Sequence, residues 1–128
     1  PLHQRILHGP LKTAYGTVEL EYLPEKKRDP WNYPVQVIQF GNDLTLVALG
    51  TEVVIDYSLR IKQELFDPEG PAIWVAGYSN VYSGYIPSKR VLLEGGYEAS
   101  RPYKPDVEER IIGKVLELDQ GLKTQETK

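Results

Sequence analysis

Two short runs of β-forming residues, at positions 35–40 and 44–49, give the clearest hydrophobic pattern in the chain. A Gly-Asn-Asp sequence at 41–43 separates them, and because these residue types tolerate a positive φ, the pattern predicts a β-hairpin. The second run is almost wholly apolar, which is typical of a strand in the middle of a sheet. A further strand is predicted within residues 1–23, where near-alternating apolar positions are Tyr15, Val18, Leu20 and Tyr22.

The pattern changes from strand to helix after residue 50. Apolar positions at helical spacing predict an α-helix over residues 53–65, with Thr51 able to cap its first turn. The sequence 67–71, which contains two prolines and a glycine, ends this helix, and the apolar run 72–76 predicts another strand. A strand–helix–strand unit of this kind has parallel strands and a right-handed crossover.

The other predicted segments are a charged, proline-containing loop at 24–34, a short helix at 88–94 and a longer C-terminal helix. Pro105 and Asp106 open the longer helix. Its apolar face consists of Val107, Ile111, Val115 and Leu118. The predicted fold is therefore mixed α/β, with a hairpin, a βαβ unit and a C-terminal helix. The chain divides into an N-terminal strand and loop (1–34), an α/β core (35–120) and a polar, frayed tail (121–128).

A tyrosine-rich segment follows the last predicted strand. Residues 77–88 together with 95–98 contain four tyrosines and four glycines, and aromatic residues concentrated in a loop are typical of a binding site. In a parallel βαβ unit the carboxyl ends of both strands meet at one edge of the sheet, so Glu52 and this loop are predicted to be neighbours. Ligands of α/β sheets bind at that edge, which makes it the predicted site.

These residues also have structural interpretations. Glu52 in the first turn of a helix is stabilised by the helix dipole, and a loop tyrosine commonly packs its ring and leaves its hydroxyl to water. Trp74 lies within an apolar run and is predicted to be in the core, whereas Trp31 is predicted to anchor a loop. His3 and His8 do not match a helical zinc-binding pair and are predicted to be solvated.

Composition limits the functions open to the chain. Its 128 residues suffice for one domain, and 41% hydrophobic with 26% charged residues is usual for a folded protein. A formal charge of −3, with no basic cluster beyond residues 26–28, argues against nucleic-acid binding. No apolar run reaches the roughly 20 residues of a transmembrane helix. Cysteine is absent, which excludes disulfides but leaves the compartment open, and methionine is absent even at position 1, so we expect a fragment or processed product.

Several motifs follow one another in a specific order between residues 35 and 118. A strand leads to the Gly-Thr-Glu sequence ending at Glu52, and a helix and a second strand lead to a Gly-Tyr-Ser-Asn-Val-Tyr-Ser-Gly-Tyr sequence ending at Tyr85. A Tyr-Glu pair begins twelve residues later, at Tyr97. In this order and spacing the chain resembles the neutral/alkaline ceramidase family.

Members of that family use a zinc ion, held by two histidines, a glutamate and a tyrosine, to activate water and cleave the amide of N-acylsphingosines. The resemblance implies that Glu52 is the carboxylate ligand, Tyr85 the phenol ligand and Tyr97 a hydroxyl donor to the oxyanion. It implies a lipid amide substrate, and a secreted or periplasmic location would agree with it. Neither His3 nor His8 matches the family's histidine motifs, so the resemblance assigns those ligands to an upstream portion of the same catalytic domain. The isolated chain is therefore expected to bind zinc weakly and to be inactive.

The sequence departs from the family after Tyr97, where Glu-Ala-Ser-Arg-Pro replaces Glu-Gly-x-Ser-Thr, and before Glu52, where Gly-Thr replaces Pro-Gly. Two other interpretations therefore stay open: a stand-alone module whose tyrosine loop binds a sugar or a partner protein, and a structural domain whose tyrosines pack over a helix. The enzymatic interpretation predicts that Glu52, Tyr85 and Tyr97 converge. A binding platform would instead spread the rings with their faces outward.

Overall fold

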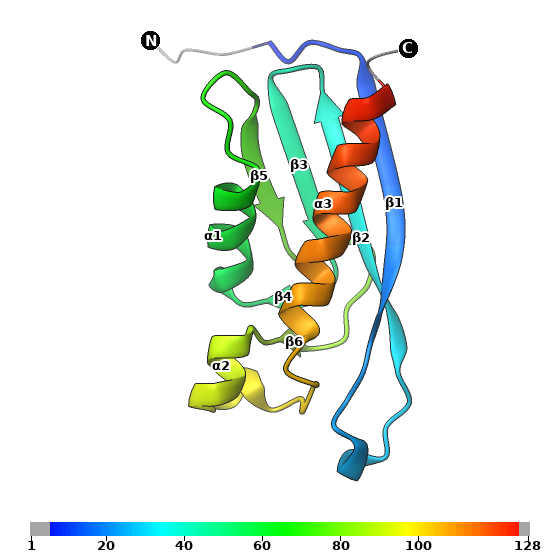
Figure 1. The fold of residues 1–128 in the computed structure, drawn as a ribbon, viewed down its shortest axis with the longest axis vertical. Helices are drawn as coiled ribbons and strands as arrows, with labels where there is room; N and C mark the ends of the chain where they lie inside the picture. Colours follow the sequence, from blue (N-terminus) through cyan, green and yellow to red (C-terminus); the bar gives the residue numbers. More distant parts are fainter. Residues whose placement is uncertain (1–5, 126–128) are drawn as a thin grey trace.

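Residues 6–125 are described by the computed structural model and form a four-stranded mixed sheet with helices packed on one face (Figure 1). The strands lie in the order β1 (Leu11–Leu20), β2 (Trp31–Phe40), β3 (Leu44–Leu49) and β5 (Ala72–Ala76). Both β1 and β3 pair antiparallel with β2, whereas β5 pairs parallel with β3. The predicted mixed α/β fold is confirmed, and β3 is an interior strand as predicted.

Helix α1 (Ile55–Glu64) connects β3 to β5 and completes the predicted βαβ unit. The predicted hairpin turn joins β2 to β3, and its first residue requires glycine. Gly41 has φ 52°, and a Cβ there would lie 2.7 Å from the carbonyl oxygen of His8. The turn therefore fixes the register in which the two central strands pair.

Shorter elements and one long helix complete the fold. They are the 3-10 helix η1 (Pro24–Lys26), strands β4 (Glu52–Val53) and β6 (Tyr85–Ile86), helix α2 (Lys89–Glu94), the 3-10 helix η2 (Tyr97–Ala99) and helix α3 (Val107–Gln125). Strands β4 and β6 form a separate two-stranded parallel sheet. Helices α2 and α3 confirm the two helices predicted after the tyrosine loop. Among the described residues, no helix has both the length and the apolar character of a membrane span.

The core lies between the main sheet and helices α1 and α3. Successive side chains of a strand point to opposite faces, so every second residue of β2 and β3 faces the helices. The fully buried residues of this layer include Val35, Val37, Val47, Leu49, Tyr57, Ile111 and Val115. A polar pair is buried among them, where Gln39 Nε2 donates a hydrogen bond of 3.1 Å to Asp119 Oδ1 and so leaves neither group unpaired.

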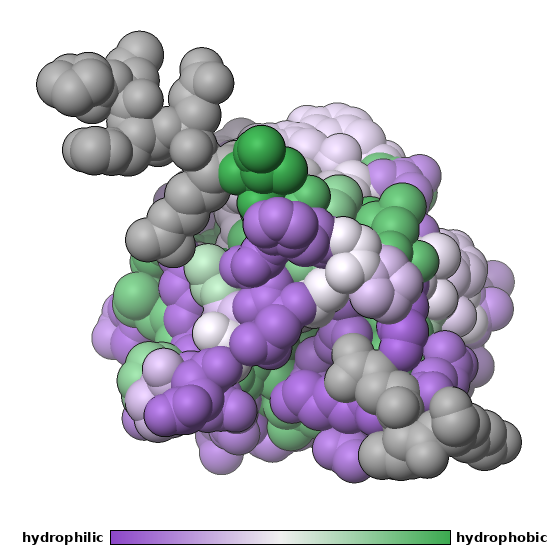
Figure 2. All heavy atoms as spheres, turned by 90° about the horizontal axis from the view of Figure 1, so that it is seen from above, coloured by the Kyte–Doolittle hydropathy of each residue, from purple (hydrophilic) through white to green (hydrophobic). Residues whose placement is uncertain are grey.

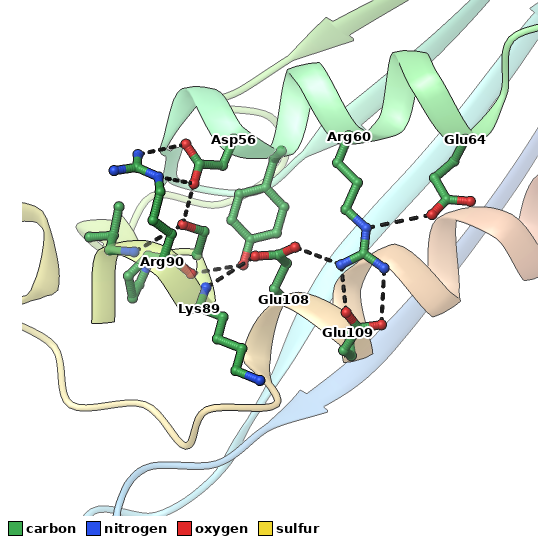
Figure 3. Close-up of polar contacts among 11 residues, drawn as sticks. Asp56, Arg60, Glu64, Lys89, Arg90, Glu108 and Glu109 are labelled. Atoms are coloured by element: carbon green, nitrogen blue, oxygen red, sulfur yellow. Dashed lines mark hydrogen bonds and ion pairs between the residues drawn. The ribbon is translucent and has the colours of Figure 1, made fainter. Parts of the chain in front are cut away.

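Charged side chains connect α1 to the other two α-helices, α2 and α3 (Figure 3). Arg60 of α1 donates to Glu108 at 2.6 Å and to Glu109 at 2.6 and 3.0 Å, both on α3. Asp56 of α1 accepts hydrogen bonds of 2.8 and 2.9 Å from the guanidinium of Arg90 on α2. These hydrogen bonds, above all, and the positive charge of Arg90 lower the pKa of Asp56 although partial burial opposes them. The network therefore joins both α2 and α3 to α1.

The structure corrects the prediction that residues 24–34 are all loop and that Trp31 is a loop anchor. Strand β2 begins at Trp31, and the indole Nε1 donates a 3.0 Å hydrogen bond to the hydroxyl of Tyr103. Strand β1 pairs with β2 along all ten of its residues, as far as Leu20 opposite Trp31. Pro34 is tolerated in β2 because β3 pairs with β2 only from Val35 onward, so that Pro34 has a strand partner on one side alone, Thr17 of β1.

The prediction that Trp74 lies in the core is wrong. Trp74 is 62% exposed because it occupies the face of β5 that points away from the helices, whereas its neighbours Ile73 and Val75 pack against the core. An apolar run does not distinguish a strand buried on both faces from one buried on a single face.

The predicted frayed tail also needs correction. Helix α3 extends to Gln125, and Leu122 is only 1% exposed. Leu122 follows Val115 by seven residues, so it lies on the same buried face of the helix. Only residues 126–128 of the predicted tail lie outside the described residues.

Replacing Leu122 by Ala is expected to lower the free energy of unfolding by about 2–5 kcal/mol, because the change leaves a cavity between α3 and the sheet. Leu93→Ala is the matched control, since Leu93 is 79% exposed and its loss should cost at most about 0.5 kcal/mol. Urea denaturation at pH 7 measures both. Equal effects of the two substitutions would contradict a folded C-terminal turn.

Candidate functional site

Two loops are joined by backbone hydrogen bonds at the edge where β3 and β5 end (Figure 1). The N–H of Tyr78 donates to the carbonyl of Thr51 at 2.8 Å, and the N–H of Thr51 donates to the carbonyl of Val81 at 2.8 Å. The N–H of Glu52 donates to the carbonyl of Gly84 at 3.1 Å, and that carbonyl also accepts from the Thr51 hydroxyl. The predicted proximity of Glu52 and the tyrosine loop is therefore observed.

Strands β4 and β6 place Glu52 beside Tyr85. The two residues are direct partners in the parallel pair, as are Val53 and Ile86. Partners on neighbouring strands share one face of the sheet, so the carboxylate and the phenol lie next to each other.

This geometry changes the interpretation of the helix start. Glu52 belongs to a strand and not to the first turn of α1, so the helix-dipole interpretation does not apply. Thr51 is not the helix cap either, because Val54 occupies that position. Thr51 has φ 53°, which turns its hydroxyl toward the loop carbonyl of Gly84.

Tyr97 lies against Tyr85. The rings of Tyr97, on η2, and Tyr85 meet edge to face with centroids 5.3 Å apart and an interplanar angle of 78°. Tyr97 is 75% exposed, so its hydroxyl is accessible from solution. The structure thus brings together Glu52, Tyr85 and Tyr97.

Tyr78 is a site residue that the family resemblance did not single out. Tyr78 and Tyr82 are both exposed, by 60% and 71%, and their rings stack on each other at 6.0 Å with 13° between planes. The Glu52 carboxylate also acts on the Tyr78 hydroxyl, whose pKa it raises. Its position in the sequence could have indicated this role, because Tyr78 directly follows the glycine after the second parallel strand.

The Glu52 carboxylate favours the protonated form of both neighbouring phenols. Its hydrogen bond with Tyr78, followed by desolvation and its charge, raises the pKa of Tyr78 to about 12. The pKa of Tyr85 is also raised, first by partial removal from water and then by the Glu52 charge. Near neutral pH both phenols are therefore hydrogen-bond donors, and Tyr85 would release its proton only if a cation compensated the second negative charge.

A cavity of about 430 Å³ opens beside Tyr85. Its acidic side chains are Glu52, Glu94 and Glu98, and Arg90 is its one basic group. Arg90 is already paired with Glu94 at 2.7 Å and with Asp56. The surroundings are therefore net negative and suit a positively charged ligand. A larger hollow of about 830 Å³ lies between α1 and α2, away from Tyr85, and its charged side chains belong largely to the network of Figure 3.

Side-chain hydrogen bonds and a glycine position the loop that carries Tyr85. The buried hydroxyl of Tyr57 donates to the carbonyl of Pro87 at 2.8 Å, and Ser88 caps α2 by accepting from the Val91 N–H at 3.2 Å. Gly84 has φ 84°, and a Cβ there would lie 2.8 Å from Nε of Arg101. The positive φ therefore favours glycine directly before Tyr85, whereas the end of the Arg101 side chain could move aside.

A carboxylate and a phenol give two oxygen donors of the kind that zinc accepts, so Glu52 and Tyr85 fit part of a zinc site. Within residues 6–125, no group of three or more His, Asp or Glu side chains is arranged to hold a metal ion. His8 lies at the opposite end of the sheet, where its Nδ1 is 2.8 Å from Asp43 Oδ2 beside the hairpin turn. Figure 2 views that end, and hydrophilic side chains gather across its middle. His3 lies outside the described residues.

No family model matches the sequence, and neither the curated proteins nor the solved structures gave a match.

The Tyr78 pKa gives a prediction about pH. Replacing Glu52 by Gln should lower the Tyr78 pKa from about 12 toward 10, because the negative hydrogen-bond acceptor is lost. NMR titration of ring-labelled tyrosine reads this directly. Since the folded-state pKa is raised, the contact with Glu52 stabilises the fold fully below pH 10, and this contribution is lost as the pH rises through about 12. Glu98→Gln is the control and should leave Tyr78 unchanged; an equal shift would mean that the effect does not come from Glu52.

Proposed function

We propose that this chain is the C-terminal part of a zinc-dependent amidohydrolase of the ceramidase type, which hydrolyses the amide of an N-acyl lipid. The observation that carries the proposal is the convergence of Glu52, Tyr85 and Tyr97 at the carboxyl edge of the sheet. These are the three residues that the resemblance singles out, and they come from separate segments of the chain. A structural domain would not require a carboxylate and an exposed phenol to meet at this edge.

Each residue has a role consistent with its surroundings. Glu52 and Tyr85 would hold the zinc ion, which when bound lowers the pKa of water and supplies the nucleophile. The Tyr78 hydroxyl, which interacts with Glu52, would orient the carboxylate as an outer partner of a metal ligand. The exposed Tyr97 hydroxyl would donate to the oxygen on which negative charge develops, a contribution of about 3 kcal/mol.

The remaining ligands in this proposal come from an upstream portion of the same catalytic domain. Two donors bind zinc far more weakly than the four of a complete site. The raised pKa of Tyr85 weakens the isolated half-site further, because the phenol must lose its proton to coordinate.

Isothermal titration of zinc tests this assignment. The 128-residue chain is expected to bind zinc weakly, and a natural polypeptide that includes the upstream portion is expected to bind it tightly. In that polypeptide, Glu52→Ala and Tyr85→Phe should each reduce zinc affinity, because each removes a ligand. Tyr82→Phe removes a nearby hydroxyl without removing a ligand and is the control. Tight stoichiometric zinc binding by the 128-residue chain, abolished by Glu52→Ala, would contradict the half-site.

The stacked pair of Tyr78 and Tyr82 favours a second candidate function, the binding of a sugar. Two exposed, nearly parallel rings offer a flat apolar surface to a pyranose. In this case Tyr82→Ala should abolish the chemical-shift changes that a saccharide library causes in the 128-residue chain, while Tyr97→Ala preserves them. The absence of any saccharide-induced shift would eliminate this candidate.

A further inference from the structure

Three glutamates line the cavity beside Tyr85, and they differ in what already holds them. Glu52 is the strand partner of Tyr85 and the proposed metal ligand. Glu94 is held by Arg90, whose Nη1 lies 2.7 Å from the Glu94 carboxylate. The exposed side chain of Glu98 makes no hydrogen bond and no ion pair with any residue that the structure describes. Glu98 is therefore the carboxylate of this cavity that stays available to a bound molecule.

The 3-10 helix η2 places Glu98 next to the residues of the proposed reaction. Glu98 is the middle residue of η2 and directly follows Tyr97, whose ring packs against Tyr85 at 5.3 Å. The pKa of Tyr85 is raised first by partial removal from water and then by nearby negative charge, to which Glu98 contributes. The Glu98 carboxylate thus lines the cavity and acts on the phenol in it.

Arg90 is the basic group of this cavity, and its charge is already neutralised. Besides Glu94, it binds the Asp56 carboxylate with 2.8 Å between Nη2 and Oδ1. The other titratable groups that line the cavity with Glu98 are Glu52 and Tyr85. No cation among the described lining residues therefore competes for the Glu98 carboxylate.

Hydrolysis of an amide needs a proton carrier that the roles assigned so far do not supply. The leaving nitrogen has to receive a proton as the C–N bond breaks, because an amide anion is a poor leaving group. In the proposed function Glu52 and Tyr85 hold the metal, and Tyr97 donates to the carbonyl oxygen. A further carboxylate at the same cavity can accept a proton from the attacking water and return it to the nitrogen.

We propose that Glu98 is this proton carrier and hence a further catalytic residue. The attacking water gives one proton to a carboxylate oxygen of Glu98 while the water oxygen bonds to the amide carbon. The carbonyl oxygen then carries the negative charge beside the Tyr97 hydroxyl. As the C=O bond re-forms, Glu98 passes its proton to the nitrogen and the C–N bond breaks. Water and amide thus give a carboxylic acid and an amine, and the Glu98 carboxylate is regenerated.

This inference rests on the proposed function, and it assigns a task to each member of the Tyr-Glu pair at 97–98. Tyr97 would donate to the oxygen of the amide, and Glu98 would carry the proton to its nitrogen. Neighbouring residues of a short helix are suited to this because the two atoms of an amide that they serve are themselves close together.

Tyrosine titration by NMR in the 128-residue chain tests whether the Glu98 carboxylate acts on the cavity. Glu98→Gln should lower the pKa of Tyr85, because it removes a negative charge that raises this pKa. Glu52→Gln should lower it further, since Glu52 exerts the larger of the two charge effects. Glu25→Gln is the matched control, because Glu25 is an exposed glutamate on the other 3-10 helix, η1, and should leave Tyr85 unchanged. An unchanged Tyr85 pKa in Glu98→Gln would overturn the proposal.

Hydrolysis of N-acylsphingosine by the natural polypeptide with the upstream portion tests the catalytic role. Glu98→Ala should reduce kcat about 10²- to 10⁴-fold, the usual contribution of a general acid–base group. Zinc affinity should stay unchanged in this variant, because Glu98 is not a ligand. Added formate, a small carboxylate that fits the space of the lost side chain, should restore part of kcat. Glu25→Ala should retain full activity.

The outcomes separate this role from the proposed function. An unreduced kcat in Glu98→Ala would overturn the proton carrier and leave the zinc function intact. A reduced kcat that formate does not restore, or that accompanies a loss of zinc affinity, would also overturn it, because Glu98 would then support the structure or the metal. A natural polypeptide that binds no zinc and cleaves no N-acylsphingosine would refute the proposed function and this inference with it.

Discussion

The backbone pairing between residues 51–54 and 78–86 is the constraint on which the rest of the site depends. Glu52 and Val54 each donate an N–H to this partner segment, and Thr51 exchanges hydrogen bonds with it in both directions. Without these bonds the chain after β3 would have several unpaired polar groups at a partly buried edge, which is costly. Because these backbone groups pair as two short parallel strands, the pairing also fixes which side chains are neighbours. Glu52 faces Tyr85 for this reason.

The same pairing explains why a carboxylate and several phenols share a small volume. The two segments follow parallel strands that end at one edge of the sheet. Gly84 adopts a positive φ, and this turn of the chain brings Tyr85 to its position. The resulting cluster is unbalanced in charge, since Glu52 raises the pKa of its phenol neighbours and Arg90 is occupied elsewhere. Side chains whose pKa values are shifted by a neighbouring charge occur frequently at functional sites.

The helices and the sheet stabilise the rest of the fold through ion pairs and apolar burial. The ion pairs of Arg60 and Asp56 hold α3 and α2 against α1, and the buried layer beneath α1 and α3 supplies most of the apolar burial. On the other side of the sheet, apolar side chains such as Leu11 and Trp74 are exposed, because no described helix covers them.

The sequence by itself determined the element order, the parallel β3–β5 crossover and the meeting of Glu52 with the tyrosine loop, because hydrophobic period and strand direction are local or topological properties. It did not determine that Trp74 points away from the core, that Leu122 is buried or that Tyr78 interacts with Glu52. Those outcomes depend on which face the helices cover and on the loop torsions at Thr51 and Tyr78, which follow from packing and hydrogen bonding between segments distant in the chain. Only the tertiary structure could decide them.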